Sequence, residues 1–188
     1  MIEQLGAYIL AGGKSSRMGQ EKGLVMYKDK PLINYALAIV VQTAGSVSIV
    51  TANPLYASLG YDLVADETPG LGPAGGVYTA LKNSSAEFVL VLGCDMPNLK
   101  PELILSMFDA MNGAEVIVAA QNGVVEPLLA IYKNSIAQQW YQYLESGTRK
   151  MTDFFNHFDC RIFETSGLFI GDENLFMNIN TPGDLGNS

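Results

Sequence analysis

Short apolar runs alternate with longer amphipathic segments along this chain. Five of these runs are rich in β-branched residues and cover residues 7–10, 47–51, 63–65, 88–92 and 116–119. Continuous apolar runs of this length are typical of strands buried on both faces of a sheet. We expect helices over residues 31–42, 73–82, 101–111, 135–144 and 149–157. The first three begin with a proline, which suits the first turn of a helix.

Strands separated by helices of this length predict parallel βαβ units. The sequence therefore favours an α/β fold with a doubly wound, mostly parallel sheet and helices on both faces. The 188 residues are 48% hydrophobic, and no repeat, low-complexity tract or linker divides them. We predict a single domain over residues 1–188, because a chain of this size can bury a substantial core.

A basic loop follows the first predicted strand. Residues 10–19 read LAGGKSSRMG, and Lys22 comes shortly afterwards. Adjacent glycines let backbone N–H groups approach a phosphate, while Arg17 and Lys22 supply the positive charge that a polyphosphate needs. Residues 14–30 hold five of the eleven basic residues and only two acidic ones, in a chain of net charge −8. This concentration favours a small anionic ligand and argues against nucleic acid, which would need positive charge spread over a face.

Polar residues also follow the other predicted strands. Asn53, Asp66 and Asp95 each come just after an apolar run, so we expect them along one edge of the sheet, where such folds bind ligands. By position alone, Asp95 could hold Mg²⁺ or cap the turn before Pro97. Asn53 could equally be a turn former before Pro54, and Asp66 a simple strand-end carboxylate. We predict that Lys22 and Asp95 face each other across a shared cleft.

Several motifs in order along the chain point to a known family. The loop at 10–22 has the pattern LAGGxSxRMGxxK, and it is followed by TAN at 51–53, GPAGG at 72–76, CDMP at 94–97, EPL at 126–128 and NINTP at 178–182. In these motifs the chain resembles the nucleotidyltransferases with a Rossmann-like fold, and most closely the molybdenum cofactor guanylyltransferase (MobA) family. The resemblance extends over essentially the whole chain.

This resemblance implies that GMP passes from GTP to the terminal phosphate of molybdopterin, with release of pyrophosphate. It implies Mg²⁺ as cofactor, held by Asp95, and a catalytic set of Arg17, Lys22 and Asp95. The implied nucleotide-binding residues are Leu10, Ala11, Gly12, Gly13, Lys22, Asn53, Asp66, Gly75 and Asp95. Gly75 lies in the first turn of a predicted helix, so it could contact an anion at the helix N-terminus or allow the helix to pack closely.

Asn178 and Asn180 would lie on the side of the second substrate. We predict a late strand at 176–177, which would turn both amides to the same face, although a turn network would also suit them. Thr181 is expected to cap a final helix. Two positions depart from the family pattern: Glu21 stands where Asp is usual, and Glu126 stands where many relatives have His or Gln before the proline.

Rival interpretations differ in substrate or in class. Molybdenum cofactor cytidylyltransferases tend to carry AAG where residues 11–13 read AGG, and sugar-1-phosphate nucleotidyltransferases usually have GTRL where residues 15–18 read SSRM. A non-catalytic nucleotide-binding protein would bind GTP without forming product. Pyrophosphate release with GTP or CTP, magnesium and molybdopterin distinguishes these alternatives.

The N-terminal sequence and the lengths of the apolar runs predict a cytoplasmic protein. The N-terminus lacks a basic, apolar signal pattern, and no apolar run approaches the roughly 20 residues that span a bilayer, so we expect no membrane partner. Cys94 and Cys160 have no metal-ligand spacing, and Cys94 fits a small buried apolar position. His157, the only histidine, is expected to be structural. Transient contacts with proteins that handle the molybdenum cofactor would suit the implied product.

Overall fold

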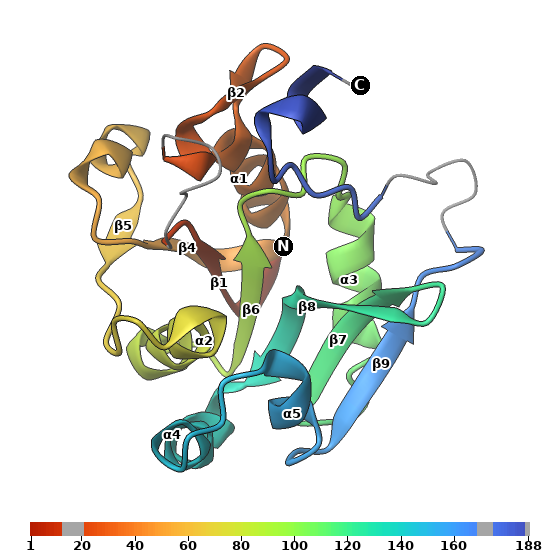
Figure 1. The fold of residues 1–188 in the computed structure, drawn as a ribbon. Coiled ribbons are helices and arrows are strands. Elements are labelled where there is room, and N and C mark those ends of the chain that lie inside the picture. Colours follow the sequence, from red (N-terminus) through yellow and green to blue (C-terminus); the bar gives the residue numbers. More distant parts are fainter. Residues whose placement is uncertain (13–20, 169–174, 187–188) are drawn as a thin grey trace.

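A mixed seven-stranded sheet forms the centre of the computed structural model, which describes residues 1–12, 21–168 and 175–186 (Figure 1). Its strand order is β5-β4-β1-β6-β8-β7-β9. The strands are β1 (Ile2–Leu10), β4 (Ala44–Val50), β5 (Asp62–Val64), β6 (Phe88–Gly93), β7 (Val116–Gln121), β8 (Val124–Lys133) and β9 (Cys160–Glu164). All neighbours are parallel except β8, which is antiparallel to both β6 and β7. The predicted α/β class with a mostly parallel sheet is confirmed.

Helices cover both faces of this sheet. Those on one face are α1 (Leu32–Thr43) and α3 (Pro101–Asp109), and those on the other are α2 (Gly72–Asn83), α4 (Ala137–Glu145) and α5 (Met151–Phe155). Successive residues of a strand point to opposite faces, and β1 shows this clearly. Its Ala7 and Ile9 pack with α1 and α3, whereas Tyr8 packs with α2 and α4.

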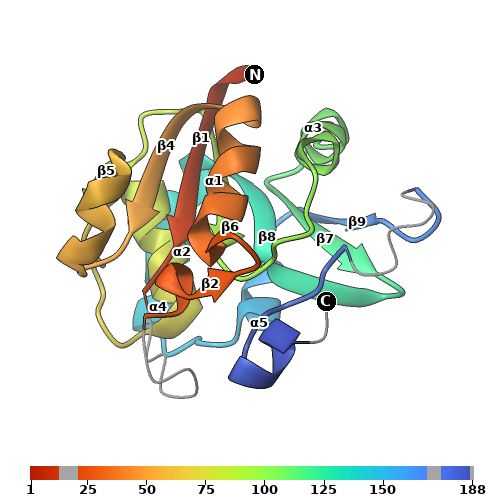
Figure 2. The ribbon, with the colours of Figure 1, turned by 90° about the horizontal axis from the view of Figure 1, so that it is seen from above.

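Short elements connect the main ones. They comprise the hairpin strands β2 (Met26–Tyr27) and β3 (Lys30–Pro31), and the 3₁₀ helices η1 (Lys22–Leu24), η2 (Pro54–Leu59), η3 (Asn134–Ile136) and η4 (Pro182–Gly186). The hairpin and the C-terminal segment share a small apolar cluster in which Val25, Tyr27, Leu32 and Ile179 are buried. The C-terminal segment therefore returns to lie beside β2 (Figure 2).

Two strands of the seven-stranded sheet, β8 and β9, were not predicted, and neither were the short hairpin strands β2 and β3. β8 mixes buried and half-buried positions and contains Glu126 and Pro127, so it lacks a continuous apolar run. β9 is an edge strand whose side chains are partly or largely exposed. The helix predicted over 101–111 ends at Asp109, because Asn112 and Gly113 turn the chain with positive φ angles of 43° and 89°.

The late strand predicted at 176–177 is wrong, since these residues form a turn and irregular backbone. The final helix is a short 3₁₀ helix that begins directly after Thr181, whose hydroxyl donates to Oδ2 of Asp184 at 3.0 Å. The same carboxylate oxygen accepts hydrogen bonds from the backbone N–H groups of Asn180 and Thr181, at 2.9 and 2.7 Å. These bonds lower the pKa of Asp184 and fix the backbone that carries Asn180.

No helix within the described ranges has both the length and the apolar character that a membrane crossing requires. The two cysteines are free thiols, with Cys94 buried and Cys160 half-buried. Burial raises the pKa of the Cys94 thiol to about 12, so it behaves as the small apolar residue predicted from the sequence. His157 stacks on Tyr143 with ring centroids 3.9 Å apart, which agrees with a structural role.

Candidate functional site

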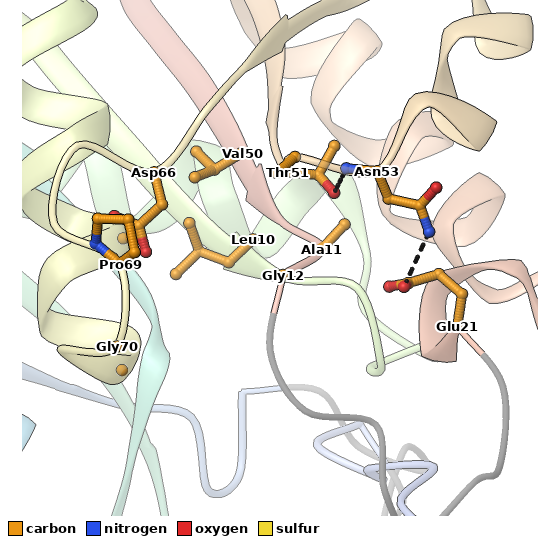
Figure 3. Close-up of a pocket in the computed structure, with 13 residues that line it drawn as sticks. Leu10, Ala11, Gly12, Glu21, Val50, Thr51, Asn53, Asp66, Pro69 and Gly70 are labelled. Atoms are coloured by element: carbon orange, nitrogen blue, oxygen red, sulfur yellow. Dashed lines mark hydrogen bonds between the residues drawn. The ribbon is translucent and has the colours of Figure 1, made fainter.

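A cavity of about 340 Å³ opens at the carboxyl edge of the sheet. Its walls come from the ends of β1 and β4, the loop after β5 and the first turns of α2 (Figure 3). The lining residues are Leu10, Ala11, Gly12, Glu21, Val50, Thr51, Ala52, Asn53, Asp66, Pro69, Gly70, Gly72 and Gly76. β1 lies between β4 and β6, where the connections leave toward opposite sides. Open α/β sheets bind ligands at such a switch point.

Backbone hydrogen bonds hold the three loops of this edge together. The N–H of Ala11 donates to the carbonyl of Val50 at 3.1 Å, and the N–H of Thr51 donates to the carbonyl of Val64 at 2.9 Å. The pairing between β1, β4 and β5 thus continues to the cavity wall. Predicted residues Leu10, Ala11, Gly12, Asn53 and Asp66 all line the same space.

Asn53 both forms a turn and lines the cavity. Its Oδ1 accepts a hydrogen bond from the N–H of Leu55 at 3.0 Å, capping η2, while its Nδ2 donates to Oε2 of Glu21 at 3.0 Å (Figure 3). Asp66 lies on the opposite side of the cavity from Glu21 and Asn53, with Leu10 and Ala11 between them. The two polar ends of the cavity are therefore separated by apolar side chains.

The Asp66 carboxylate is fixed by local contacts. Its Oδ1 accepts hydrogen bonds from the N–H of Thr68 and from Oγ1 of Thr79, both at 3.0 Å. Thr79 belongs to α2, so this carboxylate ties the loop after β5 to the helix. These contacts hold the Asp66 side chain in one position at the cavity wall, which a solvated carboxylate at a strand end would not have.

The glycines of α2 are required by close packing. A Cβ atom on Gly75 would lie 2.6 Å from Oγ1 of Thr68, and one on Gly76 would lie 2.9 Å from Cδ1 of Leu10. Gly76 lines the cavity, whereas Gly75 is buried and lies outside its lining. The geometry therefore supports a packing role for Gly75. A contact between Gly75 and a nucleotide stays a prediction.

A charged cluster lies next to the cavity. Nζ of Lys22 contacts Oδ2 of Asp95 at 2.5 Å and Oδ1 of Asn180 at 2.7 Å. The side chains of Lys22 and Asp95 are only 21% and 17% exposed. Lys22 begins η1, directly after the cavity residue Glu21, and Asp95 follows β6 by two residues. The predicted meeting of Lys22 with Asp95 is confirmed.

Asn178 and Asn180 do not act as a same-face pair. They lie in irregular backbone, and their side chains contact different partners. Nδ2 of Asn178 donates to Oε2 of Glu126 at 3.1 Å, on β8, whereas Asn180 contacts Lys22. The N–H of Ile179, between them, donates to the carbonyl of Asp95 at 2.9 Å. The C-terminal segment therefore bridges the end of β6 and the start of β8.

Two residues of the predicted loop, Gly13 and Arg17, lie outside the described residues; both are predicted to bind the nucleotide or its phosphates. Conversely, sequence reasoning did not assign Glu21, Tyr56 or Thr79 to the site. Glu21 is adjacent to Lys22 and departs from the expected Asp, which was the available signal. Tyr56 and Thr79 are ordinary core residues in the sequence pattern.

Residues 7–160 match the MobA-like NTP transferase domain. The chain belongs to this family. It is 33% identical to a probable molybdenum cofactor guanylyltransferase of Flavobacterium johnsoniae over 98% of this chain and 96% of the relative. It is 34% identical to a molybdenum cofactor guanylyltransferase of Shewanella woodyi over 97% of this chain and 94% of the relative.

A solved structure shows the same fold. It is the molybdopterin-guanine dinucleotide biosynthesis protein A of Archaeoglobus fulgidus, with a TM-score of 0.80 and 26% identity, covering 96% of this chain and 94% of the other. The family match and these relatives make the chain a nucleotidyltransferase. The cavity and the Lys22–Asp95 cluster lie together at the carboxyl edge of the sheet in this MobA-like family member.

Proposed function

We propose that this MobA-like protein transfers GMP from GTP to the terminal phosphate of molybdopterin, releasing pyrophosphate and forming a guanine dinucleotide cofactor. The observation that carries the proposal is the contact of Lys22 with both Asp95 and Asn180 beside a cavity at the switch point of the sheet. The names of the Flavobacterium, Shewanella and Archaeoglobus proteins support guanine and molybdopterin as the substrates.

The cavity provides the nucleoside subsite in this proposal. Apolar side chains of Leu10, Ala11 and Val50 would pack against the base, and the fixed Asp66 carboxylate would accept hydrogen bonds from the nucleoside. The opposite end of the cavity, at Glu21, continues directly into Lys22. The triphosphate would therefore extend from the cavity toward the charged cluster. Arg17 and Gly13, which lie outside the described residues, are proposed to contact it.

The side-chain oxygen atoms near Lys22 are suitable ligands for a magnesium ion. Oδ2 of Asp95 and Oδ1 of Asn180 converge on one cationic atom, the Lys22 ammonium. Hard oxygen ligands of this kind suit Mg²⁺, which usually takes one or two protein carboxylates and shares substrate phosphates. Within the described ranges no group of three His, Cys, Asp or Glu side chains could enclose a metal alone. When bound, Mg²⁺ would supply positive charge to the phosphate oxygens.

The chain's own residues account for the rest of the reaction. Lys22 would neutralise charge that builds up as pyrophosphate leaves, and Asp95 would hold the cation beside the α-phosphate. The acceptor is a phosphate monoester with a second pKa of about 6, so it is already largely dianionic at neutral pH. In-line attack therefore needs no general base. Asn178 and Glu126 lie on the β8 side of the cluster, where the second substrate would approach.

A single assay tests this function. Purified protein is incubated anaerobically with molybdopterin, Mg²⁺ and either GTP or CTP, and both pyrophosphate and the dinucleotide product are measured. We expect product with GTP and a clear preference for GTP when both nucleotides compete. Preference for CTP would make the protein a cytidylyltransferase instead. Binding of GTP without any pyrophosphate release would indicate a non-catalytic nucleotide-binding protein.

A further inference from the structure

A buried tyrosine lies beneath the segment that carries Lys22. Tyr56, on η2, is 0% exposed and belongs to the core cluster under α1. Its hydroxyl donates a hydrogen bond to Oε1 of Glu21 at 3.0 Å. Burial, with smaller contributions from Cys94 and Glu21, raises the pKa of Tyr56 well above its ordinary value. The hydroxyl therefore remains a hydrogen-bond donor throughout the working range of pH.

The backbone that follows Lys22 also packs against the Tyr56 hydroxyl. A Cβ atom on Gly23 would lie 2.5 Å from Oη of Tyr56, so the Gly23 backbone packs directly against it and only glycine fits. Glu21 and Gly23 flank Lys22 in the sequence. One buried hydroxyl thus contacts the residues before and after the lysine.

The Glu21 carboxylate has a second partner in the cavity wall. Its Oε2 accepts the hydrogen bond from Nδ2 of Asn53 at 3.0 Å, and Oδ1 of Asn53 is held by the N–H of Leu55. Both oxygens of Glu21 are therefore engaged by donors that β4 and η2 fix in place. A half-buried carboxylate held by two fixed donors keeps its own backbone in one position.

We infer that Glu21 and Tyr56 are positioning residues for nucleotidyl transfer, which fix η1 so that the Lys22 ammonium reaches Asp95 and Asn180. A lysine side chain has four rotatable bonds, so its backbone anchor decides where the ammonium lies. Misplacing a reacting or charge-stabilising group by about 1 Å costs a rate factor of about 10². The inference rests on the proposed function, because it assigns a role within that reaction.

The first test removes single groups of this anchor. Tyr56→Phe keeps the ring and deletes only the hydroxyl. We expect kcat for pyrophosphate release to fall about tenfold or more, with the KM for GTP nearly unchanged and the protein folded by circular dichroism. Glu21→Ala should lower kcat further and raise the KM for GTP, because Asn53 also loses its partner. Glu21→Gln retains one acceptor oxygen and should recover part of the loss.

Tyr132→Phe is the matched control. Tyr132 is also 0% exposed, and its hydroxyl has no hydrogen-bond partner among the described residues. It lies on β8 in the opposite core cluster, paired with Val89 rather than near the carboxyl edge. This variant should keep wild-type kcat and KM. Activity lost equally in Tyr56→Phe and Tyr132→Phe would show a general effect of deleting buried hydroxyls and would overturn the inference.

A double-mutant cycle separates positioning from general structural support. If Tyr56 acts through Lys22, then Tyr56→Phe should change kcat by less than twofold when Lys22→Ala is already present, measured in single turnovers. Additive losses would overturn the inference, as would wild-type activity of Tyr56→Phe. An inactive wild type would refute the proposed function together with it, whereas an active wild type with additive losses refutes the positioning role alone.

Discussion

The two halves of the sheet are built differently. In the half formed by β5, β4, β1 and β6, all strands are parallel and their carboxyl ends lead into the cavity and the charged cluster. In the half formed by β8, β7 and β9, one strand runs antiparallel and the sheet ends in an exposed edge. An aromatic cluster of α4 and α5 packs beneath this second half.

Different forces maintain the two regions. At the carboxyl edge of the first half, side chains are fixed by hydrogen bonds between polar groups, as in the contacts of Glu21, Asp66 and Lys22. In the second half, Trp140 stacks on Phe154 with ring centroids 4.2 Å apart, and both are 0% exposed. We therefore expect substitutions in the first region to change turnover and those in the second to change stability.

The largest expected effect is that of Asp95→Ala. Removing the carboxylate takes away the proposed cation ligand and the partner of Lys22, so turnover should fall about 10³-fold or more while the protein stays folded. Pyrophosphate release at saturating GTP measures the loss, and circular dichroism checks the fold. Asp109→Ala, on the exposed end of α3, serves as the control. Pyrophosphate release by Asp95→Ala at the wild-type rate would remove Asp95 from its role.

Lys22→Ala should follow, with a fall in kcat of about 10²–10³. The ammonium is the only group shown to contact both Asp95 and Asn180 among the described residues, so its loss leaves the leaving-group charge less stabilised. Lys133→Ala is the matched control, because that lysine donates to the carbonyl of Gly113 away from the cavity. If both lysine variants had near-normal kinetics, the assignment of Lys22 to the triphosphate would be discarded.

Phe154→Leu tests the second region. Loss of the ring stacked on Trp140 should lower the free energy of unfolding by about 1–3 kcal/mol, measured by denaturant titration. Activity per folded molecule should stay near that of the wild type at low temperature. Ile162 lies on the edge strand β9 and is 60% exposed, so Ile162→Ala should change the free energy of unfolding by less than about 0.5 kcal/mol. A loss of kcat in folded Phe154→Leu would break the division between the two regions.

Glu164→Gln should give the smallest effect, and one that depends on pH. The carboxylate accepts hydrogen bonds from the Ser166 hydroxyl and from the N–H groups of Ser166, Gly123 and Asn122, which lower its pKa from 4.5 to about 2. Because the folded pKa is depressed, this stabilisation is present above about pH 4.5 and is lost between there and pH 2. The variant should have a slightly lower Tm at pH 7 and the wild-type Tm near pH 2. A Tm difference that does not vary with pH would contradict this.

The sequence predicted the first region better than the second. Buried parallel strands have continuous apolar runs, so β1, β4, β5, β6 and β7 could be recognised from local pattern, as could the polar residues after several of them. β8 and β9 could not, because a strand with mixed burial and an exposed edge strand have no such signal. Asn178 and Asn180 were identified as candidates, but their turn geometry depends on Asp184 and Asp95.

The sequence alone was sufficient to predict the α/β class and the glycine-rich loop. It also identified candidate residues for the site, namely Lys22, Asn53, Asp66 and Asp95. These inferences follow from local periodicity and from the residue types that come after each strand. The meeting of Lys22 with Asp95, 73 positions away, could be predicted, because the basic loop and Asp95 each follow a strand that ends at the same edge of the sheet. Only the folded structure decided that Asn180, 158 positions from Lys22, joins this pair. It also decided that Tyr56 and Glu21 support that meeting. Such contacts depend on strand order and on the packing of the C-terminal segment, which no local pattern encodes.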